Sequence, residues 1–162
     1  VKTKSNTIKA KHVVMATHYP IKNFPGLDVH ASTQMSIHSL DGARAAADMG
    51  LTRAVLAREL SLEQIKYISK NSPIETEIFV HGALCVACSG QCLMSSMIGG
   101  RSGNRGCCGQ PCRSSYDLYN KKGKCLRKNE HLLSLKDFNA SKQLENMIDA
   151  GITSFKIEIS FL

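Results

Sequence analysis

The sequence predicts an α/β domain with a parallel sheet, interrupted by a cysteine-rich stretch. Short apolar segments alternate with helical patterns over residues 27–81 and again over residues 132–159, which is the order of βα units. Between them, residues 82–128 have no clean hydrophobic period and are rich in Cys, Gly, Ser and Arg. A structureless loop of that length is rare in a compact domain, so we expect a bound metal to organise it.

The expected strands are short runs rich in Val, Ile, Leu and Phe. Three precede the cysteine-rich stretch, at residues 29–33, 53–56 and 75–81. Two follow it, at residues 132–135 and 154–159. Because helical patterns separate consecutive strands, we expect the strands to pair in parallel.

The expected helices have recognisable ends. Ser39 is a suitable N-cap for a helix over residues 40–49, which a glycine closes. The pattern Ser61-Leu-Glu-Gln64 is a capping box for a second helix that runs to about Lys70. A third helix is expected over residues 140–150, again followed by a glycine.

Positive charge is concentrated in two blocks of a chain whose net charge is +8. Residues 1–26 carry five Lys and no acidic residue, and residues 99–128 carry eight basic residues and one acidic residue. A basic block inside the cysteine-rich stretch favours a polyanionic partner, RNA before DNA or phospholipid. A solvated basic loop explains the same charge equally well.

The composition argues against secreted and membrane proteins. No apolar run approaches the ~20 residues that a membrane span needs, and no secretory leader is recognisable. The seven cysteines are an odd number, which is unusual for a secreted disulfide scaffold. We therefore expect a cytoplasmic protein that contacts no membrane and uses its thiols for metal binding or redox chemistry.

Six of the seven cysteines fall within residues 85–112. Thiolates hold soft metals, so zinc and iron–sulfur centres are both candidates. A zinc site could combine a Cys-x-x-Cys pair with a Cys-x-x-x-Cys pair, Cys85 and Cys88 with Cys108 and Cys112. A four-iron–four-sulfur cluster could use Cys85, Cys92, Cys108 and Cys112. Spacing alone does not separate the two, and disulfides are a weaker third alternative.

Several separated stretches resemble one known family. They include residues 77–85 (EIFVHGALC), 89–95 (SGQCLMS) and 99–106 (GGRSGNRG), followed by Cys108 and the run QPCR at 110–113. Residues 50–60, 133–137 and 156–158 match as well. Over residues 27–158, the chain is therefore similar to the collagenase-like peptidase family, peptidase family U32.

This resemblance implies a TIM-barrel-like α/β domain and two alternative activities. Several members are iron–sulfur proteins that act in RNA hydroxylation, at the wobble uridine of tRNA or at a cytidine of 23S ribosomal RNA, and relatives serve in ubiquinone hydroxylation. The family name implies proteolysis instead, but no hydrolase motif in the sequence supports it. The resemblance also implies that Cys85, Cys92, Cys108 and Cys112 hold a 4Fe-4S cluster, with Cys88, Cys107 and Cys125 as extra cysteines.

Further candidate residues follow from the barrel geometry, since functional groups gather at the carboxyl ends of barrel strands. Polar residues at the expected strand ends make up the candidate catalytic set of Arg58, Glu59, His81 and Glu158. Each of them alone could equally make an ordinary strand-end hydrogen bond or ion pair. The cysteine-rich stretch should lie over the same face. Its candidate RNA contacts are Arg101, Arg105 and Arg113, together with the Lys/Arg run at residues 121–128.

The two ends of the chain depart from the family pattern. Residues 1–26 resemble a leader fragment of an FAD-dependent oxidoreductase, but without a glycine-rich phosphate loop we expect no FAD site. Residues 27–162 contain about four of the eight βα units of a full barrel, so we expect a partial, truncated barrel. A partner or a second copy would then cover the open edges. Truncation leaves open whether the chain is an enzyme, and a non-catalytic metal-binding fragment is the third interpretation.

Overall fold

The computed structural model describes residues 28–158, so the proposed leader lies outside the described residues. A five-stranded sheet forms its centre. Four strands run parallel in the order of the chain: β1 (His30–Ala31), β2 (Arg53–Val55), β3 (Glu75–Gly82) and β7 (Ser154–Glu158). The α/β class with a parallel sheet is therefore confirmed. Over residues 28–158 the sheet is open, and it closes into no barrel.

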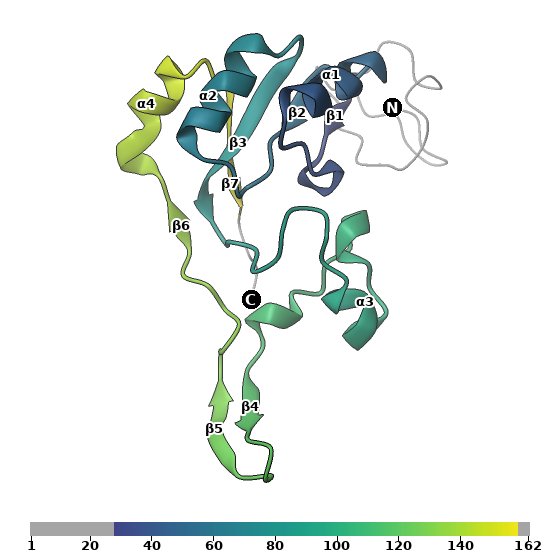
Figure 1. The fold of residues 1–162 in the computed structure, drawn as a ribbon, viewed down its shortest axis with the longest axis vertical. Coiled ribbons are helices and arrows are strands. Elements are labelled where there is room, and N and C mark those ends of the chain that lie inside the picture. The colour runs from purple at the N-terminus through teal and green to yellow at the C-terminus, as the bar shows by residue number, and fades with distance from the viewer. Residues whose placement is uncertain (1–27, 159–162) are drawn as a thin grey trace, which may run out of the picture.

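Three helices pack beside this sheet (Figure 1): α1 (Leu40–Asp48), α2 (Leu62–Asn71) and α4 (Leu144–Asp149). Both predicted caps are confirmed. The Ser39 hydroxyl accepts a hydrogen bond from the Gly42 amide at 3.1 Å, and Ser61 and Gln64 form the reciprocal capping box. A cap of this kind stabilises a helix by about 1 kcal/mol. No helix within residues 28–158 is long and apolar enough to cross a membrane.

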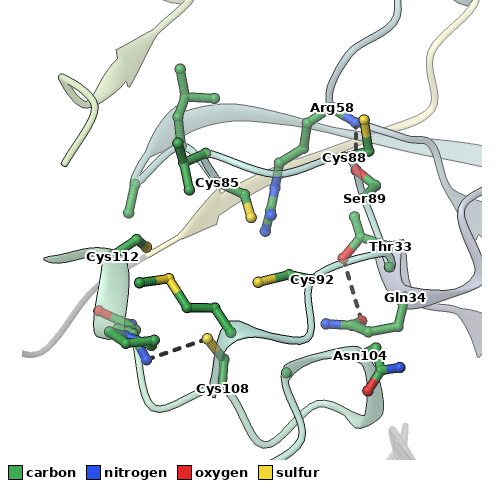
Figure 2. Close-up of a pocket in the computed structure, with 18 of the residues that line it drawn as sticks. Thr33, Gln34, Arg58, Cys85, Cys88, Ser89, Cys92, Asn104, Cys108 and Cys112 are labelled. Atoms are coloured by element: carbon green, nitrogen blue, oxygen red, sulfur yellow. Dashed lines mark hydrogen bonds between the residues drawn. The ribbon is translucent and has the colours of Figure 1, made fainter. Parts of the chain in front are cut away.

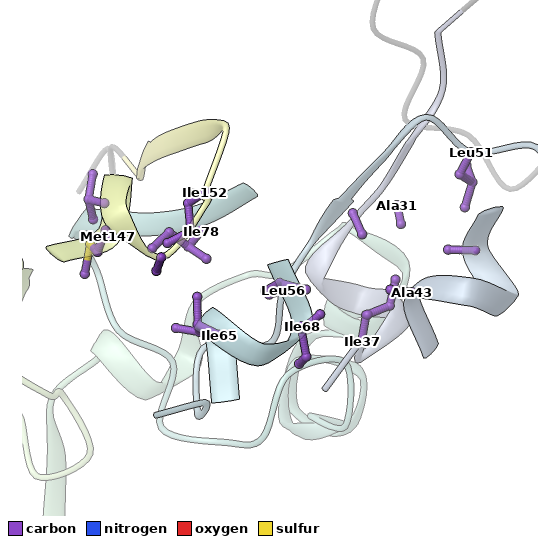
Figure 3. Packing of buried hydrophobic residues seen from close by; sticks show 14 of the residues in the cluster. Ala31, Ile37, Ala43, Leu51, Leu56, Ile65, Ile68, Ile78, Met147 and Ile152 are labelled. Atoms are coloured by element: carbon purple, nitrogen blue, oxygen red, sulfur yellow. The ribbon is translucent and has the colours of Figure 1, made fainter. Parts of the chain in front are cut away.

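One face of the sheet is apolar and packs against these helices. Ile78 and Val80 alternate along β3 with more exposed residues, and both are buried. Ile65 and Ile68 of α2 belong to the same buried cluster, and Met147 of α4 lies beside Ile78 and Ile152 (Figure 3). Alternation along β3 thus gives the sheet its inner side.

The opposite face of the sheet carries charged residues. Arg53 bonds the Glu75 carboxylate at 2.6 Å and lies 3.5 Å from that of Glu77. Lys156 approaches Glu77 from β7, at 3.8 Å, and the Ser154 hydroxyl donates to the same carboxylate. This polar ladder runs across β2, β3 and β7 near the amino ends of the three strands.

The cysteine-rich stretch contains more regular structure than the sequence predicts. It holds the short helix α3 (Met94–Gly99), two 3-10 turns (η3, Gly103–Arg105, and η4, Pro111–Arg113) and most of a β-hairpin. The hairpin consists of β4 (Tyr116–Tyr119) and β5 (Cys125–Glu130), and it projects from the molecule at the end away from α1, α2 and α4 (Figure 1).

Two elements after the hairpin differ from the prediction. Residues 132–135 form no strand, because the chain turns there: the Leu132 amide donates to the Glu130 carbonyl and the Ser134 amide to the His131 carbonyl. The Leu135 carbonyl and the Ser134 hydroxyl accept hydrogen bonds from Arg113. The strand is instead β6 (Phe138–Asn139), which pairs antiparallel with the end of β3. The predicted helix over 140–150 begins with the 3-10 turn η5 (Ser141–Gln143) and becomes α-helical only in α4.

Candidate metal centre

A pocket of about 120 Å³ lies at the carboxyl ends of the parallel strands. The sheet side of its wall includes Gln34 after β1, Arg58 after β2 and Glu158 at the end of β7. The cysteine-rich stretch leaves β3 at the same edge and provides the other side, with five lining cysteines: Cys85, Cys88, Cys92, Cys108 and Cys112. Strand ends and cysteines therefore meet at one place.

Four of these cysteines turn their sulfur atoms toward a common space. In Figure 2 the sulfurs of Cys85, Cys92, Cys108 and Cys112 face one another, whereas the sulfur of Cys88 points away beside Arg58. All seven cysteines of the chain are free thiols. The four inward-facing ones are the set that the family resemblance implied.

The two other cysteines lie elsewhere. Cys107 does not line the pocket and is exposed. Cys125 lies in β5, where its thiol donates a hydrogen bond to the Arg127 carbonyl at 3.1 Å. These two positions leave the pocket thiols as the group that a soft metal centre could use.

The pocket thiols influence one another electrostatically. Burial raises the pKa of the Cys112 thiol, and the neighbouring Cys85 and Cys108 raise it further. A thiolate at Cys85 or Cys108 disfavours ionisation of Cys112, because like charges repel each other. A bound cation reverses this effect, since thiolates rather than thiols are the metal ligands. Metal binding at this pocket would therefore release protons.

The chemistry of this donor set fits a thiolate-ligated centre. Within residues 28–158, no group of three or more His, Cys, Asp or Glu side chains is placed to hold a single metal ion. A tetrahedral zinc site needs all its sulfur ligands about 2.3 Å from one ion. No such arrangement is found within residues 28–158.

Three hydrogen bonds of Ser89 and a close backbone approach at Gly90 hold residues 85–92 against the strand ends. The Ser89 amide and hydroxyl donate to the Glu59 carboxylate at 3.0 and 2.8 Å, and the Ser89 hydroxyl accepts from the Arg58 amide at 3.1 Å. Burial alone would raise the pKa of the Glu59 carboxyl, but the hydrogen bonds from Ser89 outweigh it and lower that pKa. Gly90 has φ +73°, and a Cβ there would lie 2.4 Å from the Gln34 carbonyl oxygen.

Arg58 and Glu158 form an ion pair on the pocket wall. The Arg58 Nη2 donates to the Glu158 carboxylate at 2.7 Å, and the guanidinium carbon lies 4.4 Å from the centre of the Phe79 ring. The Arg58 Nε is buried and has no hydrogen-bond partner among residues 28–158. The two strands approach closely at this point, since a Cβ on Gly82 would lie 1.9 Å from the Glu158 carbonyl oxygen.

Arg113 is built into the protein rather than presented to solvent. Its side chain is 13% exposed. The guanidinium donates to the carbonyls of Leu135 at 2.7 Å and Leu84 at 3.2 Å. Because Leu84 precedes Cys85 and Arg113 follows Cys112, this residue ties two of the pocket cysteines together. The basic character that suggested an RNA contact did not reveal this bridging role.

The remaining candidate residues are more scattered. Arg101 and Arg105 are exposed on the loop after α3. His81 lies at the end of β3 in a neighbouring cavity, which shares Arg113 and Glu158 with the cysteine pocket. Asn104 also lines the pocket. It could not be recognised from the sequence, because an asparagine in a glycine-rich loop carries no distinguishing signal.

Known proteins resemble most of the chain. The family model described as "Peptidase family U32" matches residues 12–160, so the match begins inside the segment assigned to a leader. The chain is 47% identical over 136 residues to the "23S rRNA 5-hydroxycytidine C2501 synthase" of Escherichia coli, covering 84% of this chain and 21% of that protein. No solved structure shows a significant match.

Two further relatives carry different names. The chain is 40% identical over 140 residues to the "tRNA hydroxylation protein P1" of Bacillus subtilis, covering 83% of this chain and 33% of that protein. It is 36% identical over 146 residues to the "Collagenase" of Porphyromonas gingivalis, covering 82% and 35% respectively. The chain thus spans between a fifth and about a third of the length of these relatives.

Proposed function

The chain belongs to peptidase family U32, and on that premise we propose that it forms the cysteine-bearing part of a cytoplasmic RNA hydroxylation protein. Its target is a pyrimidine of tRNA or of 23S ribosomal RNA. The observation that carries the proposal is the convergence of four thiols at the carboxyl edge of the sheet. The names of two relatives, which concern hydroxylation of ribosomal RNA and of tRNA, support the choice of reaction.

The proposed cofactor is a 4Fe-4S cluster held by Cys85, Cys92, Cys108 and Cys112. Iron–sulfur clusters are ligated by four cysteine thiolates, which is the donor set of this pocket. We prefer it to zinc, which stays the alternative, because the family resemblance implies a cluster on these four cysteines. When bound, the cluster supplies electron-transfer chemistry at the pocket.

The protein's own groups then have separate roles. Two residues hold the loops that carry the cysteines. Glu59 does so through its hydrogen bond to Ser89, and Arg113 through its hydrogen bond to the Leu84 carbonyl. Arg58 and Glu158 are the groups best placed to orient a substrate, because they line the same pocket. The buried Arg58 Nε is a donor that no protein group uses, so we assign it to the substrate.

Proteolysis is the alternative activity, and the name of the Porphyromonas gingivalis relative favours it. A cysteine or serine nucleophile needs a base within hydrogen-bond reach. Among residues 28–158, no histidine ring is hydrogen-bonded to a Ser or Cys side chain; the rings of His38 and His131 contact backbone carbonyls. RNA hydroxylation is therefore the better-supported proposal.

The cofactor is tested by anaerobic reconstitution of the chain with iron and sulfide. We expect broad visible absorption, and iron and sulfide in stoichiometric amounts. Cys92→Ser should abolish the absorption, whereas Cys125→Ser, the matched control outside the pocket, should retain it. Zinc without iron or sulfide in the reconstituted protein would rule out the cluster.

The activity is tested in a chimera. The matching segment of the Escherichia coli relative is replaced by this chain, and hydroxycytidine in 23S ribosomal RNA is measured by mass spectrometry in cells that lack the natural protein. We expect hydroxycytidine to be restored by the chimera and by its Cys125→Ser version, but not by its Cys92→Ser version. A chimera that assembles the cluster and gives no hydroxycytidine would leave the chain as a metal-binding fragment.

A further inference from the structure

We propose that the projecting hairpin, residues 116–130, is an RNA-binding arm that lays the RNA backbone beside the cysteine pocket. We call these residues the arm. The proposal rests on the proposed function, because it assumes that the pocket acts on RNA.

The arm carries five basic and two acidic residues, which gives it a net charge of +3. All six residues of β5 are exposed, and so is most of the turn before it. The three turn lysines make no ion pair within residues 28–158; they are Lys121, Lys122 and Lys124. Arg127 and Lys128 add two more positive charges on β5. Such a cluster binds phosphates by releasing their counterions.

The two acidic residues of the arm do not cancel this charge. Asp117 is occupied by the structure of the hairpin, since it accepts hydrogen bonds from the Asn129 amide at 2.8 Å and the Tyr119 hydroxyl at 3.3 Å. Glu130 lies at the other end of β5 from the turn, 3.9 Å from Arg127. The lysine tip therefore has no acidic neighbour to compete with a phosphate.

Exposed rings and apolar side chains accompany the lysines. Tyr119 is 56% exposed, and Leu118 and Leu126 are also exposed. Unpaired bases stack on aromatic rings, and the combination of cations with a ring is the pattern by which proteins hold single-stranded RNA. RNA engages both features at once, its phosphates through the lysines and its bases through the ring, so we favour RNA.

The base of the arm is fastened to the rim of the cysteine pocket. The Tyr116 hydroxyl donates to the Pro111 carbonyl at 2.6 Å, and His131 Nδ1 lies 2.9 Å from the Arg113 carbonyl oxygen. Pro111 and Arg113 flank Cys112, so hydrogen bonds hold both ends of the arm close to a pocket cysteine. Six residues of β5 extend about 20 Å. RNA that lies along the arm therefore passes the pocket, where an extruded nucleotide could enter.

Charge neutralisation at the tip tests the proposal. In the full chain, the arm triple variant is Lys121→Gln, Lys122→Gln and Lys124→Gln. The matched control removes the same charge from α2 and η5, where all three residues are exposed: Lys66→Gln, Lys70→Gln and Lys142→Gln. Binding of a labelled oligouridylate and of a labelled tRNA is measured by fluorescence anisotropy over a range of salt concentrations.

We expect the arm triple variant to bind both RNAs about tenfold or more weakly at low salt, and the slope of log affinity against log salt to fall by about 2. The control triple should match the unmodified chain. Replacing the three tip lysines by arginine keeps the charge and should keep the binding. This third variant separates loss of phosphate contacts from damage to the hairpin.

Two results would overturn the proposal. Unchanged RNA binding by the arm triple would assign the tip to another partner, such as an acidic protein surface. Equal loss in both glutamine triples would show that net charge alone attracts RNA. Failure of the arm is distinguishable from failure of the proposed function, since the arm triple should still take up iron and sulfide, and Cys92→Ser should still bind RNA.

Discussion

The sheet with its helices and the cysteine-rich stretch are stabilised by different interactions. The sheet and helices share one cluster of buried apolar side chains, which includes Leu56, Ile68 and Ile78. Within residues 82–128 the buried side chains are Ser89 and Ser95, and no apolar side chain is buried. The first region has an apolar core, whereas the second relies on hydrogen bonds and, as we propose, on a metal centre. A functional loop can thus be ordered without a core of its own.

The largest effect should come from the core of the sheet. Leu56 is 1% exposed, so Leu56→Ala should lower the free energy of unfolding by about 2–5 kcal/mol. The measurement is urea denaturation of the reconstituted chain. In the cysteine-rich stretch, Leu93→Ala is the matched control, since Leu93 is exposed and its truncation should cost little. Equal losses for both variants would contradict the division into two regions.

The next effect concerns the junction between the regions. Gly82→Ala introduces a Cβ that meets the Glu158 backbone at a φ of +108°, and strained backbone of this kind costs about 1–3 kcal/mol in addition to the clash. We expect lower thermal stability and loss of iron. Gly99→Ala is the control, because nothing lies within 4 Å of its Cβ and its φ is not positive. A stable, iron-loaded Gly82→Ala protein would show that β3 and β7 do not meet this closely.

A smaller effect should be confined to the cysteine-rich stretch. Arg113→Lys keeps the charge but cannot make the several hydrogen bonds of the guanidinium to Leu84 and Leu135. We expect faster amide hydrogen exchange around Cys85 and Cys112, reduced iron occupancy, and an unchanged exchange rate in α2. Arg101→Lys is the exposed control. Were exchange to accelerate in α2 as well, Arg113 would be part of the common core.

The smallest effect depends on pH. The folded-state pKa of Glu59 is lowered, so its contribution to stability is fully present above its unfolded pKa and is lost as the pH falls through the folded value. In the metal-free chain, Glu59→Gln should remove this part of the acid sensitivity while leaving stability near neutral pH slightly reduced. Urea denaturation at several acidic pH values measures it. Glu63→Gln, on the exposed side of α2, should leave the pH profile as it is.

Local chemistry made the helices and their caps predictable. Ser39 and the pair Ser61 and Gln64 act within one helical turn, so three or four residues of sequence contain the whole interaction. Arg113 differs because its partners lie 21 to 29 positions away along the chain. No pattern in the sequence distinguishes that guanidinium from a basic surface residue.

The hairpin could have been predicted from its turn. Asn120 accepts hydrogen bonds from the amides of Lys122 and Lys124, and Gly123 takes a positive φ. Asn120 and Gly123 lie between two runs of residues that favour strands, and Asn and Gly at this spacing are typical of a turn. The abundance of Cys, Gly and Ser around it hid the signal. Which cysteines converge, by contrast, depends on the path of the loops, and spacing alone left zinc and iron–sulfur centres equally open.

The polar ladder on the sheet has a consequence for the protein in solution. Parallel sheets are ordinarily covered on both faces, and a bare apolar face would drive aggregation. Here Arg53, Glu77 and Lys156 form ion pairs across β2, β3 and β7 and can stay hydrated. Whatever covers this face must match its alternation of charge, because a purely apolar cover would bury those groups without water. The ladder therefore disfavours non-specific hydrophobic association of this face. It favours a covering partner whose charges are complementary to those of Arg53, Glu77 and Lys156.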